Sequence, residues 1–215
     1  ISQEEMVQQA IDEGVSPETI LKEGLLPGMN TVGEKFKNNE VYVPEVLIAA
    51  RAMTAGTTLL KPLMAAGDVV IALPSTGIHS NGFSLCRKVF NIDNNDPNLY
   101  VKKEELGGKT VAEALLVPTR IYVKSVLALL EQVDVKGISH ITGGGFYENI
   151  PRSIPDGLCA KIDKSKVKIL PIFDLIAKTG NIPERDMFNT YNMGVGMSIV
   201  VPAAEVELSL NILKD

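Results

Sequence analysis

The sequence predicts an α/β layered domain of the α+β kind, preceded by a small all-α four-helix bundle. Two observations support this fold class. In residues 1–66, apolar side chains recur at helical spacing. From Gly67 onward, short β-branched runs alternate with amphipathic segments, as expected where helices pack against a sheet. We therefore expect two domains, 1–66 and 67–215, with the second one incomplete at its C-terminal end.

Four short helices are expected in residues 1–66. Val7 and Ile11 mark the apolar face of the first helix. Ser16 followed by Pro17 is an N-cap with a first-turn proline, which predicts the start of the second. Two further apolar stripes predict a third helix and a fourth that opens at Pro44. Brief loops between them favour a small bundle, and a packed bundle with no further role is the simplest interpretation.

Strands and helices alternate in residues 67–215. Four apolar runs predict strands, at Asp68–Leu73, Lys136–Ile141, Leu158–Ile162 and Met193–Val201. Four amphipathic segments predict helices, at Phe83–Phe90, Ile121–Gln132, Ile172–Lys178 and Glu205–Leu213. The Asn- and Asp-rich segment Asn91–Asn98 predicts a loop.

Composition narrows the class of partner. The net charge of −5 and the absence of a basic stripe argue against nucleic acid. The longest apolar runs are too short for a membrane span, and the acidic, polar N-terminus does not resemble a signal peptide. Cys86 and Cys159 have no metal-type spacing, so we expect no metal ligands and a cytoplasmic location. The initial Ile1 suggests a fragment or a processed chain.

The first predicted strand leads into a polar loop that contains one of the two histidines of the chain, His79. Ser75, Ser80 and Asn81 supply hydroxyl and amide groups there, and Gly82 frees the backbone before the next helix. Amides at a helix N-terminus attract anions, and histidine changes charge near neutral pH. The loop therefore predicts an anion site with acid–base help. The alternative is a structural turn with a capping serine.

The second histidine, His140, precedes a loop made of Thr142, Gly143, Gly144 and Gly145. Three glycines lose much conformational freedom on ordering, so their backbone is expected to lie against a phosphate or a neighbouring chain. The loop has neither the Walker spacing nor the dinucleotide fingerprint.

Two further features accompany these loops. Asn149 lies one helical turn beyond the glycines and is expected to face either the same cleft or solvent. Gly194 and Gly196 are expected on one face of the last strand, where a helix or a ligand would approach closely.

Residues 67–215 resemble the C-terminal domain of phosphoribosylformylglycinamidine cyclo-ligase, also called aminoimidazole ribonucleotide synthetase. Four segments carry this resemblance, in matching order and spacing: Gly67–Ser75 with Gly77–Gly82, Pro118–Val123, His140–Phe146 with Glu148–Arg152, and Asn192–Met197.

The resemblance implies a role in purine biosynthesis. The family uses ATP, with magnesium, to activate a formamide oxygen as a phosphate ester, after which a ring nitrogen closes the imidazole. It implies a phosphorylated ribonucleotide substrate and a homodimer. His79 and His140 would be the catalytic candidates, for proton transfer or for orienting the substrate. Residues 1–66 contain no match to the family's nucleotide-binding N-terminal half, so we expect no activity from this chain alone.

Residues 1–66 resemble the helical cap of methyltransferase corrinoid proteins, which covers the upper face of a cobalamin. The matching segments are Leu26–Asn30, Val32–Phe36, Val43–Leu47 and Ala49–Met53. The cobalt-ligand loop of that family is absent, because His79 has no Asp two positions before it. Cobalamin is thus a candidate ligand for which we expect no tight binding.

Three interpretations follow from the two resemblances. The first is a cyclo-ligase-type domain fused to a helical bundle. The second is a corrinoid-associated binding module whose working part is the cap. The third is a fusion with no ligand, and the sequence alone leaves open whether the two segments form a natural fusion, a chimera or a fragment.

Overall fold

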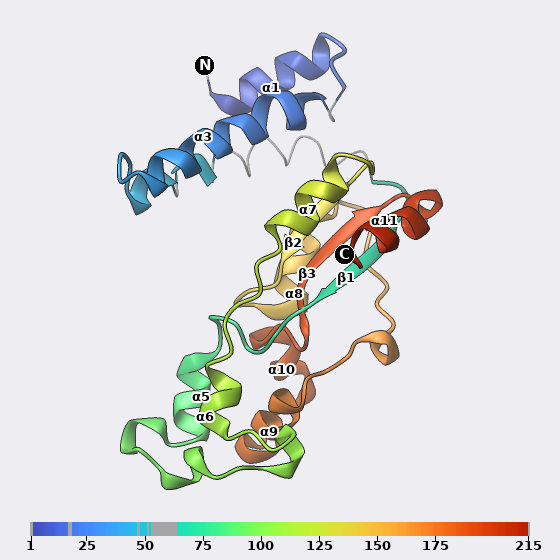
Figure 1. Ribbon diagram of the computed structural model, residues 1–215. Helices are drawn as coiled ribbons and strands as arrows, with labels where there is room; N and C mark the ends of the chain where they lie inside the picture. The colour runs from blue at the N-terminus through green and yellow to red at the C-terminus, as the bar shows by residue number, and fades with distance from the viewer. Residues whose placement is uncertain (1, 17–18, 47, 51, 53–63, 215) are drawn as a thin grey trace. The chain divides into compact units, whose positions relative to one another are not determined.

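The computed structural model describes residues 2–16, 19–46, 48–50, 52 and 64–214. The chain divides into two compact units, Ile1–Leu63 and Met64–Asp215. Figure 1 shows helices in the first unit, and helices around a small sheet in the second. The predicted fold class is confirmed, and the sheet makes it α+β.

The first unit is helical where it is described. Its bounded helices are α1 (Gln3–Asp12), the π-helical η1 (Ile20–Leu25) and α3 (Leu26–Lys37). Residues 43–46 and 48–50 are also helical, as expected for the helix opened by Pro44. A reciprocal capping box begins α1, because Ser2 Oγ accepts from the Glu5 amide while the Glu5 carboxylate accepts from the Ser2 amide. Pro17 and most of the fourth predicted helix lie outside the described residues.

The second unit contains a three-stranded antiparallel sheet. Its strands are β1 (Val69–Pro74), β2 (Gly137–His140) and β3 (Val195–Val201). The order is β1-β3-β2, so the last strand along the chain lies between the first two. This order brings the ends of β1 and β2, where the two predicted loops begin, against the same central strand.

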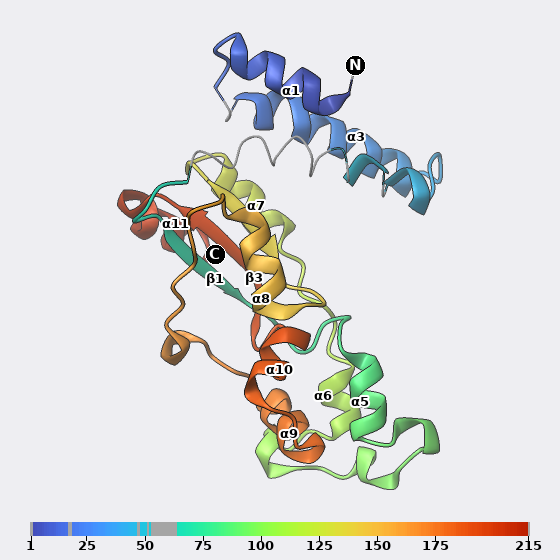
Figure 2. The same cartoon turned by 180° about the vertical axis from the view of Figure 1, so that it is seen from behind.

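The described residues of the second unit also form seven α-helices. They are α5 (Phe83–Val89), α6 (Val111–Leu115), α7 (Val123–Leu130), α8 (Gly145–Asn149), α9 (Pro171–Gly180), α10 (Glu184–Thr190) and α11 (Val206–Ile212). Short 3₁₀ turns connect them: η3 (Ile92–Asn94), η4 (Pro97–Tyr100), η5 (Glu104–Leu106), η6 (Ile150–Ser153), η7 (Lys164–Lys166) and η8 (Ala203–Glu205). Figures 1 and 2 show the sheet with α7 and α11 at one end of this unit, and α5, α6 and α9 at the other.

Two apolar cores hold the second unit together. One lies between the sheet, α7 and α11, and includes the fully buried Leu129 and Ile199. The other joins α5, α6, α8, α9 and α10 around Phe173, Ile176 and Tyr191, all fully buried. The loops that follow β1 and β2 run from the first core to the second, so both ends of each loop are anchored.

Most predicted elements of this unit are confirmed, to within a few residues at their ends. The strand predicted at Leu158–Ile162 is wrong: this segment has no regular structure and no strand partner among the described residues. It follows Gly157, whose φ of +86° turns the chain, and it lines a pocket of about 540 Å³. The predicted loop Asn91–Asn98 contains η3 and the start of η4, and the short helices α6 and α10 were not predicted.

Within the described part of the chain, no helix is both long and apolar enough to cross a membrane.

Candidate functional site

The loop after β1 is fixed to the segment before β3 by buried polar bonds. The Ser75 hydroxyl donates to Asn192 Oδ1 at 2.8 Å, and the Ser75 amide donates to the Gly194 carbonyl at 2.9 Å. Asn192 Nδ2 in turn donates to the Gly77 carbonyl at 2.9 Å. Ser75, which was predicted to offer its hydroxyl to an anion, is instead buried, and Asn192 supplies the hydrogen-bond partner that a buried hydroxyl needs. Sequence reasoning did not assign this role to Asn192.

Gly194 and Gly196 do not share a strand face, which corrects the sequence-based expectation. Gly194 precedes β3 in a left-handed conformation with φ of +97°, where a Cβ atom would lie 2.2 Å from the Lys168 carbonyl oxygen. Gly196 is within β3, and a Cβ atom there would lie 2.0 Å from Tyr122 Oη and 2.7 Å from His79 Cε1. Only Gly196 therefore makes room for the histidine loop.

His79 is buried, with 5% of its surface exposed, and has a left-handed backbone with φ of +57°. Its Nε2 atom accepts from the backbone amides of Thr76, at 3.2 Å, and Arg120, at 3.4 Å. Its Nδ1 atom is covered and has no hydrogen-bond partner among the described residues. Burial lowers the pKa of His79, and the neighbouring His140 lowers it further.

Tyr122 lies between the two histidines. Its ring centroid is 6.3 Å from that of His79 and 6.4 Å from that of His140. Its hydroxyl donates to the Pro74 carbonyl at 2.9 Å, which ties the chain before α7 to the end of β1. Burial raises the pKa of Tyr122, against a smaller opposite effect of Arg120. His140 ends β2 and is exposed. The two histidines therefore both contact Tyr122, but His79 is buried and His140 is at the surface.

Ser80, Asn81 and Gly82 lie nearer the surface. Ser80 is exposed, and Asn81 is half-buried. Gly82 has a φ of +82°, and a Cβ atom there would lie 2.1 Å from the ring of Tyr191, whose hydroxyl donates to the Gly82 carbonyl at 3.1 Å. Gly82 is thus required by packing against Tyr191, whereas Ser80 and Asn81 remain available to a ligand.

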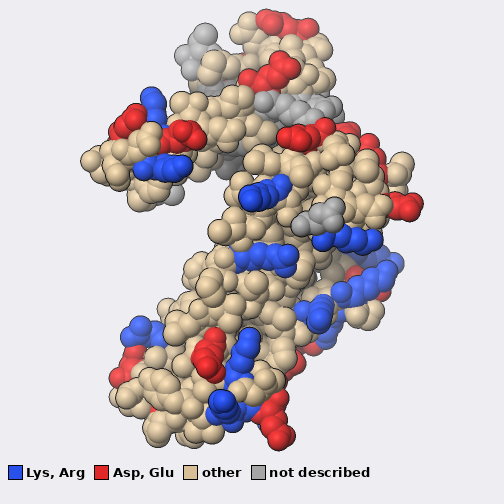
Figure 3. All heavy atoms as spheres, in the orientation of Figure 1, with Lys and Arg blue, Asp and Glu red and all other residues tan. Residues whose placement is uncertain are grey.

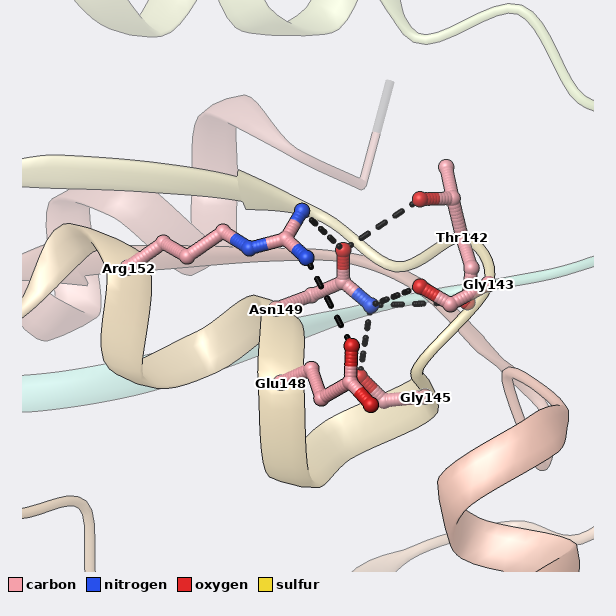
Figure 4. Close-up of polar contacts among 6 residues, drawn as sticks. All are labelled: Thr142, Gly143, Gly145, Glu148, Asn149 and Arg152. Atoms are coloured by element: carbon pink, nitrogen blue, oxygen red, sulfur yellow. Dashed lines mark hydrogen bonds and ion pairs between the residues drawn. The ribbon is translucent and has the colours of Figure 1, made fainter.

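Asn149 holds the glycine loop in place (Figure 4). Its Nδ2 atom donates to the carbonyl oxygens of Gly145, at 2.7 Å, and Gly143, at 3.1 Å. Its Oδ1 atom accepts from the Thr142 hydroxyl at 3.2 Å and from Arg152 Nη1 at 3.3 Å. The sequence-based expectation that Asn149 faces either the cleft or solvent is wrong: the side chain is buried behind the loop and bonds to it.

The three glycines meet three different surroundings. A Cβ atom at Gly145 would lie 1.9 Å from the Phe188 carbonyl oxygen, so this glycine is needed for contact with α10. A Cβ atom at Gly144 would lie 2.5 Å from a carboxylate oxygen of Glu148, which repels an anion at this point. Gly143 is exposed, and a Cβ atom there would meet Asn81 Oδ1 at 3.5 Å.

The two predicted loops therefore come together through Asn81 and Gly143, next to the His79–Tyr122–His140 array. Of the predicted site residues, Ser80, His140 and Gly143 are exposed, Asn81, Thr142 and Gly144 are half-buried, and Ser75 and His79 are buried. Figure 3 shows positive and negative side chains interspersed over the second unit, without a single basic stripe on the face drawn. Such a surface suits a small polar ligand held by hydroxyl, amide and backbone groups.

The described residues contain no group of three or more His, Cys, Asp or Glu side chains that could hold a metal ion.

The second unit is thus an α+β domain in which two histidine-bearing loops meet beside the central strand. Comparison with known proteins gives the family to which such a domain belongs. A family profile described as "AIR synthase related protein, C-terminal domain" matches residues 65–215, and the chain belongs to this family. A second profile, described as "B12 binding domain", matches residues 3–61. Both resemblances seen in the sequence are thereby confirmed.

Curated relatives match the same region. A phosphoribosylformylglycinamidine cyclo-ligase of Caldicellulosiruptor bescii is 55% identical over 148 residues, which cover 69% of this chain and 43% of that protein. The enzyme of the same name from Bifidobacterium longum subsp. infantis is 47% identical over 164 residues, 76% of this chain and 46% of that protein. The chain thus spans less than half the length of these relatives.

Proposed function

We propose that Met64–Asp215 acts as the C-terminal half of an ATP-dependent cyclo-ligase that forms aminoimidazole ribonucleotide from formylglycinamidine ribonucleotide. The observation that carries this proposal is the 55% identity over 148 residues to a protein named for that reaction. The meeting of the two loops at Asn81 and Gly143 supports it, because the motifs shared with the family lie around one surface.

In this reaction ATP converts a formamide oxygen into a phosphate ester, and attack by a ring nitrogen expels phosphate. This chain would contribute to binding and positioning. In this proposal Ser80 and Asn81 would donate to the phosphate of the ribonucleotide, together with the backbone of exposed Gly143. His140 would orient the substrate or transfer a proton, which its exposure at the end of β2 supports.

The proposed phosphate contact is testable by titration. Inorganic phosphate and the ribonucleotide should both perturb the amide signals of Ser80 and Asn81, and Asn81→Ala should weaken binding of the ribonucleotide by about tenfold, as expected for the loss of one charge-assisted hydrogen bond. Ser84→Ala is the control, since Ser84 is an exposed polar residue in the neighbouring α5 and has no part in the proposed site. Equal weakening by both substitutions would contradict the assignment.

We expect turnover to require a counterpart of the relatives' N-terminal half. Catalysis depends on holding ATP and the formamide together, and a chain that spans 43% of its relative supplies only part of that arrangement. We expect no ribonucleotide-dependent ADP release from this chain alone. Adding a separately expressed N-terminal half of a cyclo-ligase should restore it, and His140→Gln should then reduce it. ADP release by the chain alone would contradict this expectation.

A second candidate function is corrinoid binding by the first unit, favoured by the B12 binding domain match over residues 3–61. We expect this binding to be weak. A helical cap covers one face of a corrin ring, and residues 1–63 contain no histidine to ligate cobalt. A spectral shift at micromolar methyl- or hydroxocobalamin would reverse this ranking. Failure of both the cobalamin and the phosphate titrations would favour a fusion without a ligand.

The proposed function also implies the oligomeric state and the cellular location that are expected for the family. We propose a homodimer for the complete protein and a cytoplasmic site of action, to be tested by sedimentation and by fractionation of cells that express it.

A further inference from the structure

The protonation state of His79 can be derived from its neighbours. Nε2 receives two backbone N–H groups, from Thr76 at 3.2 Å and Arg120 at 3.4 Å. A backbone amide nitrogen can only donate, so Nε2 must present its lone pair. In a neutral imidazole the proton then resides on Nδ1.

The Thr76 hydroxyl offers a competing arrangement. Thr76 Oγ1 lies 3.3 Å from His79 Nε2 and could accept a proton from it. The same hydroxyl donates to the Pro118 carbonyl at 2.7 Å, so its hydrogen is already committed there. A proton on Nε2 would gain one long hydrogen bond, to Thr76 Oγ1. It would also point toward the N–H groups of Thr76 and Arg120, and both of their hydrogen bonds would be lost. The two amides therefore decide the tautomer.

The doubly protonated form of His79 is disfavoured by the same surroundings. The groups that face it are the Tyr122 ring, His140 and the chain at Arg120, and none is a carboxylate that would stabilise an imidazolium. Burial lowers the pKa of His79 in the same direction. The geometry of the two amides and this environment agree.

We infer that His79 is held as a neutral imidazole protonated at Nδ1, with its Nε2 lone pair occupied by the amides of Thr76 and Arg120, so that it ties these two segments together and does not act as a base. The exposed His140 is then the histidine that exchanges protons with a ligand, a step that rests on the proposed function. Sequence reasoning treated the two histidines as equivalent candidates. The structure separates them, because one imidazole has its acceptor nitrogen occupied by the backbone and the other reaches the surface.

Nuclear magnetic resonance of the ligand-free full chain tests the assignment to His79. The chain has two histidines, so long-range ¹⁵N–¹H correlation spectra contain two imidazoles, which a His140→Gln variant assigns. We expect the neutral His79 to show a protonated Nδ1 and an unprotonated Nε2, and to take up its second proton at a pH below its ordinary pKa. A protonated Nε2 in the neutral ring, or a pKa of His79 at or above the ordinary value, would overturn the inference.

A Thr76→Val variant separates the amides from the hydroxyl. Valine keeps the backbone amide and the shape of Thr76 but removes Oγ1, so the His79 tautomer should be unchanged. A switch of tautomer in Thr76→Val would show that the hydroxyl sets it, and would also overturn the inference. Because no ligand or turnover enters these measurements, their outcome is independent of whether the cyclo-ligase proposal holds.

Discussion

Replacing Asn149 by alanine should destabilise the second unit by about 2–4 kcal/mol. The side chain is 3% exposed, and three of its bonds, to Gly145 O, Gly143 O and Thr142 Oγ1, measure 2.7, 3.1 and 3.2 Å. Each such bond contributes about 1 kcal/mol net, and polar groups left buried without partners add to the loss. The carbonyl oxygens of Gly143 and Gly145 cannot turn to other donors in the variant, because the turn into α8 fixes the backbone.

Asn149→Asp is a sharper version of the same change. The carboxylate keeps the size of the side chain and its acceptor oxygen, but it places a second oxygen against the Gly143 and Gly145 carbonyls. We expect a loss at least as large as that of Asn149→Ala. Arg152→Ala is the comparison: Arg152 is 65% exposed, pairs with Glu148 at 3.7 Å and donates one long bond of 3.3 Å to Asn149 Oδ1, so its removal should cost less than about 1 kcal/mol and leave the bonds from Asn149 to the glycine loop in place.

Urea unfolding followed by the imidazole signals of His79 and His140 measures these effects, because both histidines belong to the second unit and the first contributes no signal. The reasoning is refuted if Asn149→Ala loses less than about 1 kcal/mol, or if Arg152→Ala loses as much as Asn149→Ala.

Three further predictions concern the same unit. Gly145→Ala should cost more than about 3 kcal/mol, because it combines a φ of +56° with a Cβ contact of 1.9 Å to Phe188 O, whereas Gly157→Ala, with a φ of +86° and no atom within 4 Å, should cost only about 1–2 kcal/mol by urea unfolding. The free energy of unfolding should decline as the pH falls below about 6.5, by up to about 1.4 kcal/mol per pH unit. The pKa of His79 is lower in the folded chain than in the unfolded chain, so below this pH the unfolded chain binds more protons and is favoured. His79→Asn should remove this component of the pH dependence while tolerating the left-handed backbone, and an unchanged slope in that variant would assign the effect to other groups.

The elements that were predicted well are those in which one local pattern decides the structure. The apolar run that forms β1 and the amphipathic pattern that forms α9 each favour a single type of secondary structure. The order β1-β3-β2 was not predicted, because it depends on pairing between residues as distant as Val69 and Val201. Leu158–Ile162 shows the converse, since a strand-like composition forms no strand where no partner strand is available.

The loops themselves were located correctly, but the sequence did not separate their residues by role. Ser75 and Ser80 are the same residue type in one loop, yet Ser75 is buried against Asn192 and Ser80 is exposed. Composition cannot make this distinction, because a polar side chain satisfies the same pattern whether its partner is the protein or a ligand.

A physical criterion would have found the supporting residues. A turn of three glycines has no side chains with which to satisfy its own carbonyl oxygens, so a buried donor must come from elsewhere. An amide that follows the turn by one helical turn is well placed for this, and Asn149 has that position. Asn192 does the same for the Gly77 carbonyl across the sheet. The two asparagines therefore belong to the framework of the loops, and it is this framework that leaves Asn81 and Gly143 side by side at the surface, where a ligand can meet them.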